Sequence, residues 1–144
     1  MTQKDKELLL KDLCSRIPYG VKMNHIADEE ICPLTLVGVA KDMITLQGGG
    51  GYTCTCVEDY TPYLFPLSSM TEEQWRELFE IAGYEVREED CGRHTEMYYY
   101  DMVGHENTLY PNCDAIDWLN AHHFDYRGLI EKGLAIDATG KNIY

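Results

Sequence analysis

Two adjacent histidines, His122 and His123, end an apolar helical stretch and are the first residues that could do chemistry. At 100° per residue, both fall on the apolar side of the helix expected from Ala115, near its carboxyl end. One interpretation is a hydrogen-bonded pair that fixes the helix to a sheet, which the helix dipole favours there and which is the more common arrangement. The other is a ligand pocket, completed by the residues that follow: Asp125, Tyr126 and Arg127.

Four further side chains are of the kind that zinc prefers: Cys91, His94, His105 and Cys113. Their spacing does not match a standard zinc finger, because no Cys-x₂-Cys pair is present. Cys54 and Cys56 would share one face of an expected strand and could add two thiols, although such cysteines are commonly small buried residues. We therefore expect neither a metal nor a cofactor, and keep a zinc or Cys/His-dependent enzyme as the alternative.

No pattern identifies a catalytic centre. A cysteine nucleophile needs a histidine within hydrogen-bond reach, and six cysteines with five histidines offer chance pairs but no local signature. The four glycines at 48–51 are not followed by Gly-Lys-Ser/Thr, so they predict a hairpin tip rather than a phosphate loop. The expected protein is not an enzyme.

Tyrosine is abundant, with eleven in 144 residues. Tyr98 and Tyr100 would share one face of a strand expected over 97–103. Tyrosine fills strands well, but its rigid ring and hydrogen-bonding tip also suit recognition. If a nucleotide base stacked on these rings, an arginine would have to hold its phosphates: Arg87, Arg93 or Arg127.

From the charge distribution we expect no direct nucleic-acid binding. The net charge is −13, and 13 acidic against 3 basic residues lie between Glu58 and Glu106. A field of this sign repels phosphate backbones. The acidic middle is either a solvated surface, the more common case, or a face that docks on a basic partner.

The chain shows no sign of export. Its start has no apolar region typical of a signal peptide, and no run of about 18 apolar residues could span a membrane. We expect a cytoplasmic protein with free thiols.

The elements that must position these residues form one α+β domain over residues 1–144. An amphipathic helix is expected over 4–17, with Cys14 on its apolar arc and Asp12 on its polar one. Short strands are expected at 21–26, 34–40, 43–47 and 52–57, with a tight turn at 41–42. They predict a small twisted antiparallel sheet or open barrel.

The second half is expected to add helices that pack on this sheet. Residues 58–69, with two prolines, predict a crossing loop. Thr71 and Gln74 form a capping box, with Met70 and Trp75 as its hydrophobic staple, and Gly83 closes the helix. Asp114 is expected to cap a helix to about 123, and Asp125 a second short helix closed by Gly133.

Three blocks of the sequence are similar to those of a known family: LLLKDLCSRIPYGV, PYLFPLSSMTEE and the stretch 115–135. The family consists of uncharacterised small acidic proteins encoded by gut anaerobes, their phages and mobile elements. The resemblance covers about half of the chain and brackets both ends. It supplies no activity, cofactor or catalytic residue, but it implies an accessory protein of a phage or mobile element, a class that often acts on host machinery or host immunity.

The leading hypothesis is therefore a non-catalytic accessory protein in the cytoplasm of a bacterial host. It would bind a host protein, or sequester a small nucleotide signal, to weaken host defence. An assembly subunit that forms a homo-oligomer is a further alternative.

Overall fold

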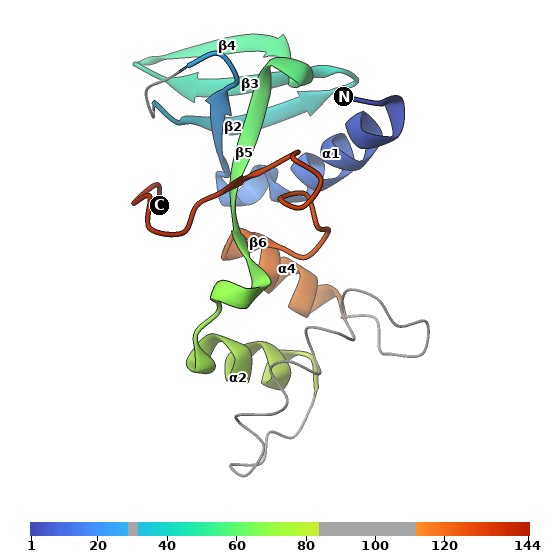
Figure 1. Ribbon diagram of the computed structural model, residues 1–144, viewed down its shortest axis with the longest axis vertical. Coiled ribbons are helices and arrows are strands. Elements are labelled where there is room, and N and C mark those ends of the chain that lie inside the picture. The colour runs from blue at the N-terminus through green and yellow to red at the C-terminus, as the bar shows by residue number, and fades with distance from the viewer. Residues whose placement is uncertain (29–31, 84–111) are drawn as a thin grey trace.

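The computed structural model describes residues 1–28, 32–83 and 112–144, and these form a mixed α/β fold with an open, seven-stranded sheet (Figure 1). The strand order is β4-β3-β2-β1-β5-β6, and β7 also pairs with β5. The helices are α1 (Gln3–Arg16), α2 (Glu72–Ile81) and α4 (Cys113–Ala121). The strands are β1 (Lys22–His25), β2 (Leu34–Ala40), β3 (Met43–Gly48), β4 (Gly51–Cys56), β5 (Tyr60–Pro66), β6 (Phe124–Asp125) and β7 (Ile136–Asp137).

Helix α1 begins at a capping box, in which the Thr2 hydroxyl and the Asp5 carboxylate each accept from the other residue's backbone N–H. The helix forms as expected, but the predictions for two of its residues, Cys14 and Asp12, are wrong. Cys14 is exposed, whereas Asp12 is fully buried together with Arg16. The buried side of the helix accepts these charges because the two side chains pair with each other four residues apart.

The first four strands are all antiparallel neighbours and lie within about one residue of their predicted bounds. The predicted turn at 41–42 is confirmed, with Lys41 in the left-handed region at φ 55°. Between β3 and β4, Gly49 and Gly50 have φ of 56° and 85°. Two successive positive φ values define a type I′ turn, whose twist matches that of the strands it joins.

The predicted crossing loop at 58–69 is wrong, because its middle is β5, flanked by short 3₁₀ turns at Val57–Asp59 and Leu67–Ser69. Strand β5 pairs with β1, β6 and β7. Prolines in a strand are tolerated where no N–H is needed. Here the bonds to the C-terminal segment use the Leu64 carbonyl and the Phe65 N–H. The β5–β6 and β5–β7 pairs are parallel, so the expectation of a purely antiparallel sheet is also wrong.

Helix α2 follows its sequence signals closely. Thr71 and Gln74 form the predicted capping box, and Gly83 follows the helix at φ 86°. Helix α4 is capped by the Asn112 side chain, which accepts from the Ala115 N–H at 2.8 Å, and not by Asp114, which lies inside the first turn. The second short helix expected after Asp125 is absent from the described residues, which form β6 and a series of turns there.

The buried apolar side chains form two clusters. The sheet core lies between α1, the antiparallel strands and the C-terminal turns: Leu9, Leu13, Val21, Met23, Leu36, Ile44, Leu46, Val57, Leu64, Leu129, Leu134 and Ala135. The helix core joins α2 and α4 to the end of β5: Leu67, Met70, Trp75, Leu78, Ala115, Trp118, Leu119 and Phe124. Within the described residues, every helix is too short or too polar to cross a membrane.

Candidate functional site

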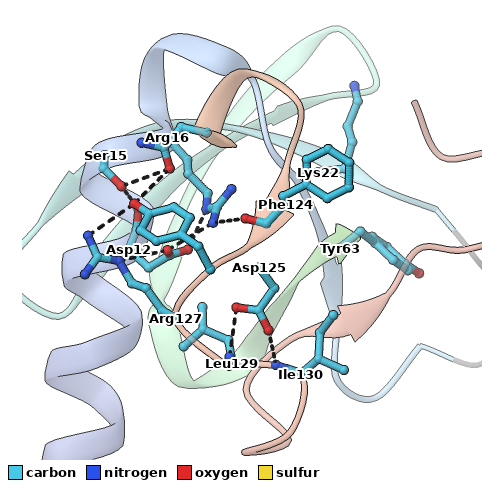
Figure 2. Close-up of polar contacts among 12 residues, drawn as sticks. Asp12, Ser15, Arg16, Lys22, Tyr63, Phe124, Asp125, Arg127, Leu129 and Ile130 are labelled. Carbon is cyan, nitrogen blue, oxygen red and sulfur yellow. Dashed lines mark hydrogen bonds and ion pairs between the residues drawn. The ribbon is translucent and has the colours of Figure 1, made fainter. Parts of the chain in front are cut away.

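A buried ion pair ties α1 to the C-terminal segment. The Arg16 Nε and Nη2 atoms lie 2.6 and 3.1 Å from the two carboxylate oxygens of Asp12, and neither side chain is exposed. Arg16 Nη2 also donates to the Phe124 carbonyl of β6 at 2.8 Å (Figure 2). One donor, Arg16 Nη1, is buried without a hydrogen-bond partner among the described residues. The sequence analysis missed this pair, although an Asp and an Arg four residues apart beside an apolar stripe could have indicated it.

Arg127 and Tyr126 extend this network outward. Arg127 Nε lies 3.2 Å from Asp12 Oδ1, and its side chain is 22% exposed. Arg127 Nη2 donates to the Tyr126 hydroxyl (3.2 Å), which donates to Asn120 Oδ1 (3.1 Å). The guanidiniums of Arg16 and Arg127 also lie 5.4 and 4.8 Å from the centre of the Tyr126 ring. Two arginines thus share one carboxylate and one ring.

The Asp125 carboxylate accepts hydrogen bonds from the backbone of the C-terminal turns. Its two carboxylate oxygens accept from the Leu129 and Ile130 N–H groups at 2.9 and 2.8 Å, as Figure 2 shows. The side chain is buried, and each oxygen is held by the chain itself. The prediction that Asp125 caps a second short helix is wrong, because its carboxylate instead holds the backbone of a turn.

The two histidines lie against different partners. The His122 ring stacks on Trp118 with 3.9 Å between ring centres, and its Nδ1 lies 2.9 Å from the Trp118 carbonyl. The His123 ring stacks on Tyr144 at 3.8 Å, and its buried Nδ1 has no hydrogen-bond partner in the described part of the chain. The predicted hydrogen-bonded pair that fixes the helix to the sheet is therefore not seen, because the His122 ring bonds to a carbonyl of its own helix.

The environment of His123 keeps it neutral. Burial, followed by electrostatic repulsion from Arg16, His122 and Lys22, lowers its pKa from 6.5 to about 4. The Tyr144 ring, which stacks on His123, is held by its hydroxyl. This hydroxyl donates to the Tyr63 carbonyl (2.6 Å) and accepts from the Lys22 N–H (3.1 Å). Burial raises the pKa of Tyr144 to about 12. This stack therefore adds neither a charge nor a reactive proton near neutral pH.

Most of the remaining predicted site residues lie outside the part of the chain that the structure describes. Cys91, Arg93, His94, Tyr98, Tyr100 and His105 lie outside the described residues. Cys113, the fourth predicted zinc ligand, is exposed in the first turn of α4. Across residues 1–28, 32–83 and 112–144, no three His, Cys, Asp or Glu side chains gather closely enough to hold a metal ion.

A second candidate site is the outer edge of β4. Among the described residues this strand pairs with β3 alone, at the end of the sheet (Figure 1). The pair that closes a two-residue hairpin exchanges hydrogen bonds, and such pairs then alternate along the ladder. The Val57 N–H accordingly donates to the Asp42 carbonyl at 2.9 Å. It follows that the backbone groups of Tyr52, Cys54 and Cys56 point away from β3.

The side chains of β4 are exposed on both faces of the sheet except for Thr55, which is half-buried. Tyr52, Cys54 and Cys56 share the outer face with residues of β3, because the Gln47 amide reaches the Tyr52 hydroxyl (3.5 Å) and Cys56 Sγ lies 3.9 Å from Met43 Sδ. Tyr52 is 71% exposed. The expectation that the Cys54 and Cys56 thiols are small buried side chains is wrong, since both are exposed.

The two candidate sites differ in what they have left to offer a ligand. In the buried network, most polar atoms already have a partner within the chain. Along β4, a row of backbone donors and acceptors and a large tyrosine face outward. Comparisons of the chain with protein-family models, curated proteins and solved structures gave no match, so the edge of β4 and the buried network are the features on which a function can be argued.

Proposed function

We propose that this protein is a non-catalytic binding protein that adds an extended segment of a partner protein to its sheet along β4. The observation that carries the proposal is the composition of this edge. Gly51–Cys56 contains no charged residue and no proline, and its open side shows the backbone groups of three residues. Soluble proteins usually protect such an edge with a charge, a proline, a bulge or a covering segment.

Strand addition uses what this edge supplies. Main-chain hydrogen bonds give affinity, and alternate side chains give specificity. Tyr52 is the largest exposed apolar side chain of the strand, and tyrosine is enriched among residues that dominate binding energy. We expect its ring to be the main anchor for a side chain of the partner.

The charge of the chain favours a basic partner segment. The net charge of −13 attracts basic proteins at long range and speeds their association, and salt screens this attraction. With the resemblance to accessory proteins of phages and mobile elements, this favours a basic protein of the bacterial host as the partner. The same charge disfavours a nucleotide signal, and the Tyr126 ring, one aromatic surface of the predicted pocket, already carries two guanidiniums.

The test is amide hydrogen exchange with and without a captured host protein. In the free protein, the outward N–H groups of Tyr52, Cys54 and Cys56 should exchange fast, while those of Thr53 and Thr55 should exchange slowly. A partner that adds a strand should slow the first set. Two matched variants separate the contribution of the backbone from that of the side chain. Tyr52→Pro removes an outward N–H donor, whereas Tyr52→Thr keeps this donor but removes the ring.

We expect Tyr52→Pro to abolish binding and Tyr52→Thr to weaken it. A captured protein that binds Tyr52→Pro as tightly as the unmodified chain, or that protects amides of α1 or α2 instead of β4, would contradict the proposal.

A further inference from the structure

We infer that Cys54, Cys56 and Met43 form a surface site for a soft monovalent metal ion, with copper(I) as its biological occupant. The three sulfurs lie on the outer face of the β3–β4 hairpin. Met43 is directly opposite Cys56 in the register, and Cys54 lies two residues along the same strand. In a strand, residues two apart point to the same face.

The distance between the Cys56 and Met43 sulfurs suits two ligands of a three-coordinate site. Cys56 Sγ and Met43 Sδ are 3.9 Å apart. Metal–sulfur bonds of about 2.3 Å that meet at 120° separate two sulfurs by about 4 Å. The Cys54 thiol, on the same face, would supply the third ligand after a rotation about its side-chain bond.

The chemistry of the donors selects the ion. Thiolate and thioether sulfurs are soft ligands that favour copper(I), whereas structural zinc sites almost always complete a tetrahedron with four thiolate or imidazole ligands. The described residues place no third His, Cys, Asp or Glu with the two thiols. Two thiolates and one neutral thioether fit a small monovalent soft ion.

The exposure of these sulfurs is unusual in itself. Cysteine is among the residue types most often buried, yet Cys54 and Cys56 are both exposed and Met43 is 37% exposed. Burial in the sheet core therefore does not explain why three sulfurs gather on one face of the hairpin. Binding would release the two thiol protons, because the thiolate is the ligand.

This site is independent of strand addition along β4. The backbone groups of the edge lie in the plane of the sheet, whereas the sulfurs stand on its face. Replacing the sulfurs leaves the outward N–H groups in place, so either proposal can fail while the other holds.

The test is an anaerobic titration of the full chain with copper(I) in competition with a chromophoric copper(I) chelator. We expect one ion per chain at this site. Cys54→Ser and Cys56→Ser should each weaken binding more than about a hundredfold, beyond what loss of a merely supporting residue costs, and Met43→Leu about tenfold. Cys14→Ser is the matched control, since Cys14 is an exposed thiol on α1.

X-ray absorption of the loaded protein should show three sulfur neighbours around the copper. The inference is overturned if Cys14→Ser weakens binding as much as Cys54→Ser. It is equally overturned if either hairpin cysteine variant keeps full affinity, or if Met43→Leu binds as tightly as the unmodified chain. Circular dichroism of each variant confirms that the sheet is intact, which the exposed positions of all three residues lead us to expect.

Discussion

The two ends of the sheet differ in whether their polar groups have partners within the chain. At the closed end, β5 is covered by two short parallel strands, and the segment that supplies them is fixed by the Asp12–Arg16 pair and by the Asp125 carboxylate. At the open end, β4 is an uncharged edge whose outward backbone groups have no neighbouring strand among the described residues. Most polar groups at the closed end are used by the fold, and those at the open end remain available to a partner.

This contrast separates stability from binding. Buried, paired charges are costly to break, because the remaining partner is left without compensation in a poorly solvated place. Exposed strand residues cost the fold little when they change. Substitutions at the closed end should therefore change unfolding, and substitutions at the open end should change recognition.

The largest effect is expected from Asp12→Ala. The substitution leaves the buried Arg16 guanidinium with the Phe124 carbonyl and the Tyr126 ring but without a counter-charge, and it removes the carboxylate that Arg127 also faces. Breaking such a pair should lower the free energy of unfolding by about 3–5 kcal/mol, measured by urea unfolding. The matched control is Glu72→Gln, which breaks an exposed pair with Arg76 at 3.7 Å and should cost no more than about 0.5 kcal/mol. Equal losses in the two variants would mean that burial does not distinguish them.

A smaller loss is expected from Asp125→Ala. Two backbone N–H groups lose their acceptor, but only that of Leu129 is buried, whereas Ile130 is half-buried. An unsatisfied buried donor costs about 1–3 kcal/mol, and we expect the total loss to lie in this range. Asp125→Asn, which keeps one oxygen acceptor, should retain part of that stability. If both variants unfold at the same urea concentration as the unmodified chain, the C-terminal turns do not depend on this carboxylate.

The pH dependence of stability should report on His123. Its pKa is about 4 in the folded protein and 6.5 when exposed. Between pH 4 and 6.5, this histidine is protonated in the unfolded chain but neutral in the folded protein. Its contribution to stability is therefore complete above pH 6.5 and is lost as the pH falls toward 4. Urea midpoints measured from pH 7.5 to 5, above the range where carboxylates titrate, should therefore decrease with falling pH. His123→Asn, which tolerates the positive φ of 59° at this position, should flatten the decrease, and an unchanged slope would assign it to another group.

The strands and helix caps could be predicted because their signals are local. The strand-forming runs of β2, β3 and β4, the turn at Lys41 and the capping box at Thr71 each depend on a few neighbouring residues. Strand β5 could not be recognised in the same way. Its prolines suggested a loop, and it is a strand because β1, β6 and β7 pair with it from distant parts of the chain.

The candidate sites show the same limit. The sequence drew attention to Asp125, Tyr126 and Arg127, which the structure places in or beside one network, but it did not indicate Asp12 or Arg16, more than 100 residues earlier. It also indicated that Cys54 and Cys56 share a face, but not that the face is open. Exposure depends on which strand ends the sheet, and strand order is a property of the whole fold.

The smallest effect on stability is expected from Tyr52→Thr, the same variant that should weaken partner binding. Tyr52 is 71% exposed, and the hydrogen bond that its hydroxyl accepts from Gln47 is long at 3.5 Å. Threonine keeps a high strand propensity, so the free energy of unfolding should change by less than about 0.5 kcal/mol, measured by urea unfolding beside Asp12→Ala. A large loss of stability would show that the ring supports the hairpin. Lost binding with unchanged unfolding would instead mean that the ring is kept for a partner, since the fold gains almost nothing from it.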